Sequence, residues 1–320
     1  MKAMILAAGL GTRLAPYTDI LAKPAIPFLN IPLFYYSIAL LRAGGLTLDE
    51  CIINSHHKAE QIRILADAVK PSHVTFEKEK PLGSGGGVWF AREYFKNEKD
   101  FIVTNGDEVI LPTHVDLMSQ MLKQHQDSGA LVTLLVKRDP RVGTQFGGVW
   151  TSGDREVFGF GKQSPQAGLE GLHYVGVMLM SSRALKYFPE GESNILYDAV
   201  MSARSAGEKI EVFIDDCRWY ETGNIKDYLI ATDEVLGELK KNPQDPFLNH
   251  LLREFAPQCS FISEMVFADR SAKIDAAALL SGFVVLGRNV KVPAGCMLHN
   301  VVVRENVELE ARSYRDDLIL

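Results

Sequence analysis

The chain opens with the stretch Met4-Ile-Leu-Ala-Ala-Gly-Leu-Gly-Thr-Arg13, and Lys23-Pro24 follows ten residues later. The apolar run from Ala3 to Ala7 predicts a buried strand. That strand ends at a loop containing Gly9 and Gly11, where backbone amides can close around an anion. The arginine and the lysine would add a planar guanidinium and a point charge. The stretch therefore predicts a phosphate-binding loop.

This loop matches neither of the two common nucleotide-binding fingerprints. A dinucleotide-binding loop needs a third glycine near position 14, where the chain has Leu14. A P-loop needs Gly-Lys-Ser/Thr, which is absent from the sequence. The two glycines alone are also compatible with a tight strand-to-helix turn that binds nothing.

The longer pattern is more specific than the two glycines. Gly9-Leu10-Gly11-Thr12-Arg13-Leu14 and Ala22-Lys23-Pro24 resemble the sugar-1-phosphate nucleotidylyltransferase family, whose signature is Gly-x-Gly-Thr-Arg-Leu followed by Pro-Lys-Pro. Only the first proline of the second element differs. The resemblance implies that Arg13 holds the leaving pyrophosphate and that Lys23 acts near the α-phosphate. It also implies nucleotide contacts from Leu6, Ala8, Gly9, Gly11 and Thr12.

Composition is that of an ordinary globular protein with room for one large and one small domain. The chain has 320 residues, of which 47% are hydrophobic and 23% charged. Its net charge of -6 argues against a nucleic-acid partner, because binding a phosphate backbone favours a basic surface. An anion site must therefore be built locally.

Cysteine usage and hydropathy favour a cytoplasmic protein. The four cysteines lie far apart and form no Cys-x-x-Cys pair, so neither a disulfide framework nor a zinc site is indicated. The apolar N-terminal run is interrupted by Gly9, Gly11 and Arg13 before it reaches the length of a signal peptide. No segment approaches the roughly 18 continuous apolar residues of a membrane span.

Alternating strand and helix patterns predict an α/β fold with a Rossmann-like, mostly parallel sheet. After the first strand come a helix over 32–41 ending at Gly44-Gly45, a strand over 51–54, a helix over 60–69 and a strand over 74–77. Right-handed crossovers make such strands parallel, and ligands then bind beyond their carboxyl ends. The glycine loop lies at such an end.

A second glycine-rich segment, Pro81-Leu-Gly-Ser-Gly-Gly-Gly87, is predicted as a loop before a helix over 88–94. Its glycines would let the backbone approach a flat or charged ligand closely, although a flexible loop is the alternative. The segment resembles the base and ribose contact loop of the family, Pro-Leu-Gly-Thr-x-Gly. The resemblance implies nucleotide contacts from Gly83 and Ser84.

Two carboxylates just upstream bear on the identity of the base. Glu77 and Glu79 stand where uridylyl and thymidylyl members of the family often place a glutamine. A carboxylate can accept hydrogen bonds from the ring and amino donors of guanine, which favours GTP, and we select Glu79 as the contact. The alternative is a solvated charge run that alternates with Lys78 and Lys80.

Metal-binding residues are expected at two later positions. The strand Phe101–Asp107 delivers Asp107 to the same sheet edge, where it can ligate Mg²⁺ between phosphate oxygens. An Asx turn is the alternative. Gly106-Asp107 resembles the Gly-Asp metal ligand of the family, with a nucleotide contact at Gly106. Glu221 takes the place of the family's second aspartate, one methylene longer, ahead of a helix that runs to Leu239.

Three short strands between 146 and 180 are predicted to form an added sugar-binding region. By resemblance, Gly148 and Gly176 supply backbone contacts to the sugar, and Lys162 binds its phosphate. The family's Phe-x-Glu-Lys-Pro has Gly161 in place of the glutamate here. An ordinary exposed lysine is the alternative for Lys162.

The C-terminal residues repeat with a period of six. Ile274, Leu280, Leu286, Val292 and Leu298 are spaced by sixes, a second row runs from Ala278 to Val302, and the register slips by one after Leu298. This period predicts a parallel β-helix, and the resemblance implies a left-handed one used for homo-oligomerisation. The predicted domains are a catalytic domain over 1–240, a linker over 241–262 with a short amphipathic helix, and a partial β-helix over 263–320.

The resemblance implies an enzyme that transfers a nucleoside monophosphate from a nucleoside triphosphate to a sugar 1-phosphate and releases pyrophosphate, with Mg²⁺ as cofactor. Mannose-1-phosphate guanylyltransferase is the favoured assignment, and a glucose-1-phosphate thymidylyl- or uridylyltransferase comes next. A nucleotide-sugar-binding regulatory protein with weak catalysis is the alternative from another class, because Glu221 and Gly161 depart from the family pattern. A nicotinamide oxidoreductase is disfavoured by Leu14 and by the β-helix.

Overall fold

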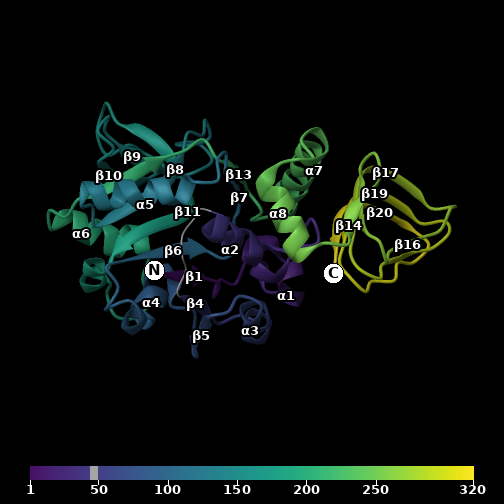
Figure 1. Cartoon of the computed structure of the whole chain (residues 1–320), viewed down its shortest axis with the longest axis horizontal. Helices are drawn as coiled ribbons and strands as arrows, with labels where there is room; N and C mark the ends of the chain where they lie inside the picture. The colour runs from purple at the N-terminus through teal and green to yellow at the C-terminus, as the bar shows by residue number, and fades with distance from the viewer. Residues whose placement is uncertain (44–49) are drawn as a thin grey trace. The chain divides into compact units, whose positions relative to one another are not determined.

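The computed structural model describes residues 1–43 and 50–320. The chain divides into two compact units, one formed by Met1–Gly9 with Leu40–Trp219 and the other by Leu10–Ala39 with Tyr220–Leu320. Two elements, α2 (Leu33–Ala43) and β13 (Arg218–Tyr220), run across the division. Figure 1 labels the elements along the chain. The predicted helix end at Gly44-Gly45 lies outside the described residues.

The first unit is built on a nine-stranded sheet in the described part of the chain. Four strands in the order β5-β4-β1-β6 are all parallel, with Met4 paired to Ile52 on one side and to Val103 on the other. The predicted parallel α/β sheet is therefore confirmed for this half. The strands are β1 (Lys2–Leu6), β4 (Glu50–Ser55), β5 (Ser72–Phe76), β6 (Asp100–Asn105), β8 (Val132–Lys137), β9 (Gly148–Thr151), β10 (Val157–Gly161), β11 (Glu170–Ser181) and β12 (Ile210–Ile214).

Beyond β6 the sheet becomes mixed. The long strand β11 runs antiparallel to β6, β8 and β9, and β10 continues the antiparallel branch beyond β9. Strand β12 adds parallel to β8. The short strand β7 (Val109–Leu111) lies outside this sheet. The region between 146 and 180 is thus an extension of the central sheet.

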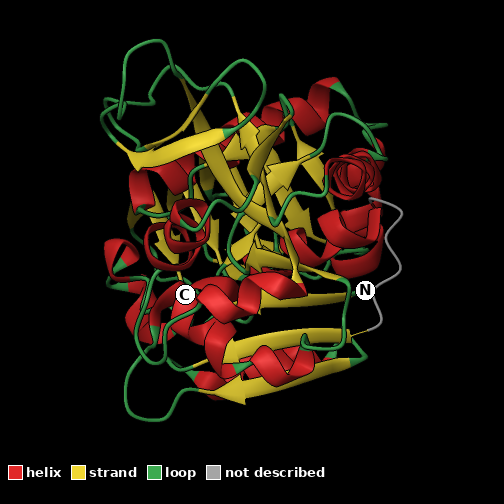
Figure 2. Ribbon diagram, turned by 90° about the vertical axis from the view of Figure 1, so that its left-hand side faces the viewer, coloured by secondary structure: helices red, strands yellow, loops and turns green. Residues whose placement is uncertain are grey.

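Both faces of the central sheet are buried. Met4, Ile52 and Val103 contribute to one core cluster with Val88 and Phe95. Their strand neighbours Ala3, Ile5, Ile53 and Ile102, which point to the opposite face, are also fully buried. Because both faces are covered, the parallel strands read as continuous apolar runs. Figure 2 shows these strands at the centre with helices on either side.

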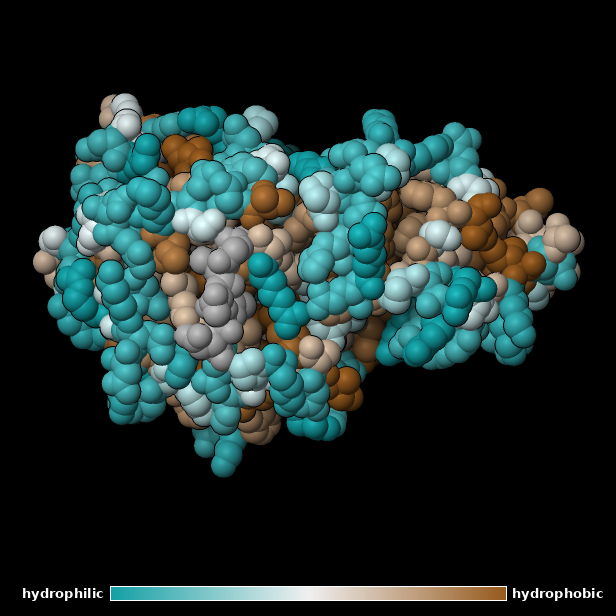
Figure 3. All heavy atoms as spheres, viewed as in Figure 1, coloured by the Kyte–Doolittle hydropathy of each residue, from teal (hydrophilic) through white to brown (hydrophobic). Residues whose placement is uncertain are grey.

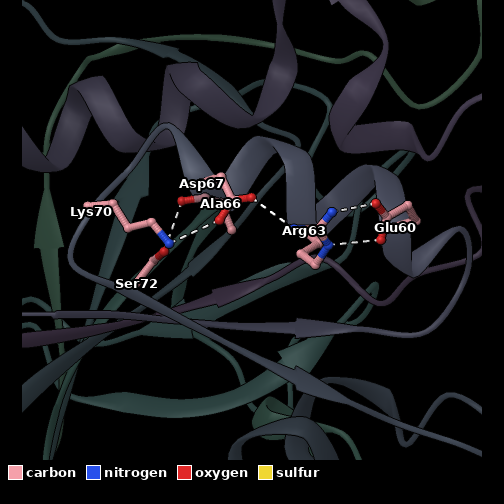
Figure 4. Close-up of polar contacts among 6 residues, drawn as sticks. All are labelled: Glu60, Arg63, Ala66, Asp67, Lys70 and Ser72. Carbon is pink, nitrogen blue, oxygen red and sulfur yellow. Dashed lines mark hydrogen bonds and ion pairs between the residues drawn. The ribbon is translucent and has the colours of Figure 1, made fainter.

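The helices of this unit largely follow the predicted pattern. They are α3 (Ala59–Asp67), α4 (Gly83–Phe90), α5 (Leu117–Ser128) and α6 (Met201–Ser205), with 3-10 turns at Arg92–Tyr94 and Ser182–Tyr187. A π-helical turn at Ile195–Val200 leads directly into α6. On α3, Arg63 pairs with Glu60 and Asp67, and Asp67 pairs with Lys70 (Figure 4). These pairs are exposed, so they contribute little to stability.

The second unit combines the segment after the glycine loop with the C-terminal part of the chain. Its early elements are a 3-10 turn at Thr12–Leu14, α1 (Tyr17–Ile20), a 3-10 turn at Lys23–Ala25, β2 (Pro27–Phe28) and β3 (Ile31–Pro32). Its long helices are α7 (Ile225–Lys241) and α8 (Pro246–Phe255). The hydroxyl of Tyr228 on α7 donates to the carbonyl of Pro27, and Phe28 packs edge-on against Tyr36 and Tyr228.

Two further contacts fasten the early segment to the C-terminal strands. The Tyr17 hydroxyl donates to Asp317 Oδ1 over 2.5 Å. The Asn30 side-chain amide donates to the carbonyl of Leu286 over 2.9 Å. The segment between Arg13 and Lys23 is therefore attached to the C-terminal strands.

Residues 266–320 form a coil of stacked parallel strands, and Cys259–Ser263 pairs antiparallel with its first strand. Val266 pairs with Val284 and Leu280 with Leu298, a step of 18 residues that equals three of the predicted hexads. The strands are β14 (Cys259–Ser263), β15 (Val266–Asp269), β16 (Lys273–Ile274), β17 (Leu279–Leu286), β18 (Lys291–Val292), β19 (Met297–Val303) and β20 (Ser313–Ile319). The final residues pair along β19 as part of this coil.

At the register slip in the coil, the six-residue period assigns Val302 to the wrong row. Val301 and Val303 join the interior cluster, so the expectation that Val302 belongs to the same row as Val284 is wrong. Val284 pairs with Val301, after a bulge at which Asn300 takes a left-handed conformation with φ of 52°. The corner in β19 has one residue fewer than the corresponding corner in β17, so Val302 lies on the outer face.

The outer face of the coil is covered by helix α7. Phe267, Val285, Val302 and Leu318 form one row in register across β15, β17, β19 and β20, and all four are buried. Helix α7 packs on β19 and β20. Helix α8 lies within the predicted linker over 241–262, where a short amphipathic helix was expected. The predicted boundaries at 240 and 262 stay a prediction.

Among the described residues, no helix combines the length and the apolar character that crossing a bilayer would need.

Candidate active site

The carboxyl ends of β1 and β6 meet where the order of the sheet strands reverses. In open α/β sheets ligands bind at such a switch point. The backbone N–H of Gly106 donates to the carbonyl of Leu6 over 2.9 Å, so the turn that carries Asp107 lies against the end of β1. The turn before Asp107 thus lies at the end of β1, where the glycine loop begins, and the role of Asp107 stays a prediction.

Gly11 is required by the packing of the loop that follows. It has a φ of +65°, and a Cβ there would lie 2.8 Å from Thr18 Cγ2 and 3.2 Å from Lys23 Cβ. The Thr18 hydroxyl donates to the Gly11 carbonyl over 3.2 Å. The loop is therefore closed against the segment that carries Lys23, which brings two of the predicted phosphate-binding positions together.

Arg13 and Glu221 lie side by side in the second unit. The Arg13 Nη2 atom is 3.9 Å from Glu221 Oε1, and the arginine side chain is 71% exposed against 16% for the glutamate. The N–H of Gly223 donates to the same Oε1 over 2.7 Å, which turns the carboxylate toward the arginine. At 3.9 Å the guanidinium makes no hydrogen bond to Glu221, so its donors can serve an anion.

A buried polar network that the sequence analysis missed connects β1, β4 and α4. The Ala7 N–H donates to Asn54 Oδ1 over 2.8 Å, and Asn54 Nδ2 donates to Glu77 Oε1 over 2.7 Å. The second Glu77 oxygen accepts from the Leu82 N–H over 2.6 Å. Asn54 and Glu77 are each 2% exposed. The network fixes the end of β1 relative to the start of α4.

This network separates the two carboxylates considered for base recognition. Glu77 is committed to internal hydrogen bonds, so its interpretation as part of a solvated charge run is wrong. Glu79 is exposed, as are Lys78 and Lys80. Of the two carboxylates, Glu79 is thus the one that faces solvent.

The prediction of a glycine-rich loop followed by a helix from Val88 is wrong, because α4 begins at Gly83 and contains the glycines. The reason is close packing. A Cβ at Gly86 would lie 2.7 Å from Leu82 Cβ and would overlap the carbonyl oxygen of Gly191. The Ser84 hydroxyl accepts from the Ile195 N–H over 3.0 Å. The glycines therefore serve helix packing, and nucleotide contacts from Gly83 and Ser84 stay a prediction.

The predicted sugar-binding positions fall on neighbouring strands of the first unit. Gly148 on β9 pairs directly with Gly161 on β10, so Lys162 follows in the next position. The indole N–H of Trp150 donates to the Gly161 carbonyl over 2.8 Å, which fixes this peptide. The Lys162 side chain is exposed.

Gly176, the third of these positions, lies against the turn after β6. A Cβ at Gly176 would lie 2.9 Å from Asn105 Nδ2 and 2.9 Å from Glu108 Cγ, and its φ is +90°. Asn105 Nδ2 donates to Glu108 Oε1 over 3.0 Å. Trp219 Nε1 donates to Glu108 Oε2 over 2.8 Å. Glu108 is thus held by two side-chain donors next to Asp107.

Trp219 belongs to an aromatic cluster with the loop before β9. Its ring lies 4.3 Å from the His173 ring and edge-on to Phe146 at 5.6 Å. Burial lowers the pKa of His173 to about 4, so the imidazole is neutral near pH 7. The hydrogen bonds from Arg141 lower the pKa of Asp139 to about 2 and hold the loop in place.

A comparison with models of protein families identifies the family of the chain. Residues 2–238 match the family described as nucleotidyl transferase. The chain belongs to this family. The sequence-based assignment to the sugar-1-phosphate nucleotidylyltransferases is thereby confirmed, and the curated relatives agree with it.

Curated relatives of this nucleotidyl transferase carry several substrate names. A UTP–glucose-1-phosphate uridylyltransferase from Synechocystis is 30% identical over 77% of this chain and 66% of its own length. A glucose-1-phosphate thymidylyltransferase from Streptomyces griseus is 30% identical over 74% and 66%. A mannose-1-phosphate guanylyltransferase from Mycobacterium tuberculosis is 27% identical over 97% and 82%. The chain thus spans about two thirds of the length of the first two relatives.

Solved structures confirm the fold of the nucleotidyl transferase. HddC from Yersinia pseudotuberculosis complexed with GMP-PN has a TM-score of 0.58 at 22% identity, over 73% of this chain and 99% of that one. The inositol-1-phosphate CTP transferase from T. maritima has a TM-score of 0.59 at 17% identity, over 72% and 94%.

The metal ligands Asp107, in the first unit, and Glu221, in the second, stay a prediction. Within residues 1–43 and 50–320, no three His, Cys, Asp or Glu side chains gather as a metal site. Mg²⁺ is commonly held by one or two carboxylates together with substrate phosphates, so a nucleotidyl transferase needs no complete protein cage. Asp107 and Glu221 supply hard oxygen donors of this kind.

Sequence reasoning missed Asn54 and Trp219. A usable signal was present for the first, because Asn54 is a polar residue near the end of a buried strand, as Asn105 is. The role of Trp219 depends on the pairing of distant segments, which no local pattern shows.

Proposed function

We propose that the protein transfers a nucleoside monophosphate from a nucleoside triphosphate to a sugar 1-phosphate and releases pyrophosphate. Membership of the nucleotidyl transferase family supports the reaction class. The observation that carries the proposal is the exposed Arg13 guanidinium in the Gly-x-Gly-Thr-Arg loop, near Glu221 but not hydrogen-bonded to it. Such a group is held in place and still has donors for a polyphosphate.

In this proposal the chain acts by positioning and by neutralising charge. The sugar phosphate attacks the α-phosphorus in line, so a P–O bond forms to the sugar phosphate while the bond to pyrophosphate breaks. Arg13 binds the leaving pyrophosphate, Lys23 the α-phosphate and Lys162 the sugar phosphate. Asp107 and Glu221 would hold Mg²⁺, which neutralises charge on the phosphate oxygens.

The nucleotide and the sugar that we propose are GTP and mannose 1-phosphate. The guanylyltransferase relative from Mycobacterium tuberculosis aligns over 97% of this chain, including the coil, whereas the uridylyltransferase relative covers 77%. The exposed Glu79 is available to accept from guanine. A glucose-1-phosphate thymidylyl- or uridylyltransferase is the alternative, because both names occur among relatives at 30% identity.

We further propose a cytoplasmic homo-oligomer that associates through a left-handed β-helix. The support for the helix is the 18-residue step between parallel strands, which fits three six-residue sides per coil. The support for association is a pair of exposed apolar side chains on the coil, Leu279 and Met297, in direct register.

Pyrophosphate release tests the proposed reaction. The purified chain is incubated with Mg²⁺, with GTP, dTTP, UTP, CTP or ATP, and with mannose 1-phosphate or glucose 1-phosphate. Release with GTP and mannose 1-phosphate above all other pairs is the expected result. Release with another pair would correct the substrate assignment and keep the reaction class.

The regulatory alternative rests on Glu221 and Gly161, and the same panel tests it. Nucleotide binding is measured by thermal shift, since a ligand at 100 times its dissociation constant stabilises by about 2.7 kcal/mol. A thermal shift without pyrophosphate release from any pair would contradict the proposed enzyme and favour a regulatory binder.

A further inference from the structure

The Glu108 carboxylate has a fixed orientation that the proposed reaction does not yet use. Asn105 Nδ2 donates to Oε1 over 3.0 Å, and Trp219 Nε1 donates to Oε2 over 2.8 Å. These two donors are neutral groups, so the two hydrogen bonds orient the carboxylate without adding a counter-charge. The side chain is only partly buried. A carboxylate offers about four acceptor sites, of which these two hydrogen bonds use one on each oxygen.

The surroundings of Glu108 place it on the sugar side of the first unit. A Cβ on Gly176 would lie 3.2 Å from Glu108 Oε1, so the carboxylate rests on bare backbone of β11. Trp219, which holds the other oxygen, packs on Phe146, two residues before Gly148. Glu108 therefore touches or adjoins the segments that carry two of the proposed sugar contacts.

The chemistry of a carboxylate limits what it can bind there. A phosphate would be repelled by it, whereas a neutral hydroxyl donates a charge-assisted hydrogen bond to it. A sugar 1-phosphate combines both groups, and Lys162 is a cation available for the phosphate. The carboxylate therefore suits the hydroxyl-bearing face of the ring.

We propose that Glu108 is a specificity-determining residue that accepts hydrogen bonds from hydroxyl groups of the sugar, with Trp219 and Asn105 as positioning residues. This inference rests on the proposed function and deepens it. The competing role is a ligand for the divalent ion beside Asp107. A contact with the sugar would make KM for the sugar phosphate depend on Glu108, whereas a metal ligand would make KM for Mg²⁺ depend on it.

The test compares Glu108→Gln and Trp219→Phe with the wild type and with Glu190→Gln. Glu190 is an exposed glutamate of the same unit and serves as the matched control. KM is measured separately for sugar phosphate, nucleotide and Mg²⁺, with GTP and mannose 1-phosphate and with dTTP and glucose 1-phosphate. Thermal unfolding shows whether each variant is folded.

For Glu108→Gln we expect KM for the sugar phosphate to rise about 10- to 100-fold, because a hydrogen bond to a charged group is lost. KM for the nucleotide and for Mg²⁺ should stay within about twofold. Trp219→Phe should raise KM for the sugar phosphate by a smaller factor, since it removes one donor that orients the Glu108 carboxylate but leaves the carboxylate in place. Glu190→Gln should match the wild type.

Deoxy analogues of the sugar phosphate assign the hydroxyl. The wild type should be less active with the analogue that lacks the contacted hydroxyl than with the complete sugar phosphate. The Glu108→Gln variant should be equally active with both, because the substitution and the deoxygenation remove the same contact. Two of the outcomes overturn the inference alone: an unchanged sugar KM in a folded Glu108→Gln variant, or a shift confined to Mg²⁺. No turnover by the wild type with any pair would instead overturn the proposed function, and the inference with it.

Discussion

Arg13 is the residue on which the proposed reaction depends most directly. Its guanidinium is exposed and stands 3.9 Å from Glu221. Leu14, the next residue, is fully buried and fixes the backbone of the short turn. The position of the arginine is thus set by packing, while its donors remain in solvent.

We expect Arg13→Ala to lower kcat/KM for the nucleotide about 10- to 100-fold, the usual effect of losing hydrogen bonds between charged groups. The kcat/KM of Arg13→Lys should lie between those of the wild type and Arg13→Ala, because an ammonium group keeps the charge but cannot donate two parallel hydrogen bonds as a guanidinium does. Steady-state kinetics at varied nucleotide concentration provides the measurement. Arg138→Ala, which removes an exposed arginine paired with Glu170, is the control. Equal effects at the two arginines would contradict the role of Arg13.

His114 gives a pH-dependent contribution to stability. Burial opposes its charge, but hydrogen bonds to Asp215 and Asp116, each 2.9 Å, outweigh burial and raise its pKa above 6.5. A raised folded-state pKa means that the stabilisation is fully present below about pH 6.5 and is lost as the pH rises through the folded-state value.

We therefore expect His114→Gln to reduce the free energy of unfolding more at pH 5.5 than at pH 8.5. Urea denaturation of the variant and the wild type at both values measures the difference. His250→Gln is the control, because His250 is an exposed histidine that pairs with Glu254 on its own helix. A loss for His114→Gln that is equal at the two pH values would refute the coupling.

At the residue scale, the sequence predicts which charged residues and glycines matter better than it predicts which residues they contact. The Gly-Leu-Gly-Thr-Arg pattern identifies Arg13 because the chemistry is local. Glu77 and Glu79 look alike in an alternating run, and only the fold decides that Asn54 pairs with the first. The contact between Trp219 and Glu108 joins residues 111 positions apart, which no spacing rule predicts.

At the scale of elements, α4 shows how a glycine cluster can serve packing. A Cβ at Gly83 or Gly85 would overlap Ser193, and a Cβ at Gly86 would overlap Gly191, so these three positions have no room for a side chain. The sequence pattern was correct in predicting close backbone approach. The close approach that the structure shows is to another segment of the chain, and contact with a nucleotide stays a prediction.

The helix glycines allow a matched pair of substitutions. We expect Gly86→Ala to destabilise the protein by about 1–3 kcal/mol, because its Cβ has no room beside Leu82 and Gly191. Gly237→Ala, within α7 and with nothing within 4 Å of the added Cβ, should stabilise it by about 0.5–1 kcal/mol. Chemical denaturation measures both. Stabilisation by both substitutions would show that α4 has room for side chains.

The coil was predictable because its period is carried by apolar residues alone. The hexad rows over 274–298 correspond to the 18-residue steps between strands. The slip was located correctly after Leu298, where the corner at Asn300 lies. It was not carried into the second row, in which Val301 and not Val302 pairs with Val284. Periodicity thus identifies the architecture, whereas corners require backbone geometry.

At the scale of the whole molecule, the coil has an exposed apolar surface. Leu279 is 64% exposed and Met297 is 45% exposed, and the two are adjacent on β17 and β19. Figure 3 shows hydrophobic side chains over this part of the molecule. Apolar side chains stacked in register on a flat strand surface are a common basis for association.

We expect the double substitution Leu279→Lys and Met297→Lys to shift the protein toward monomer, because like charges in register repel. Light scattering coupled to size exclusion, at several concentrations, reports the mass. Glu310→Lys, an exposed charge change elsewhere on the coil, is the control. A wild type that is monomeric at every concentration would refute the proposed association.

The hydrogen bonds from Tyr17 to Asp317 and from Asn30 to Leu286 have a consequence for protein engineering. They join the nucleotide-loop segment to the last and middle turns of the coil. A chimera that exchanges the coil for that of a relative would therefore need residues 17 and 30 re-matched to their new neighbours. Grafting at a boundary near 240 without this adjustment should yield a protein whose phosphate loop is poorly ordered even when both donor pieces fold.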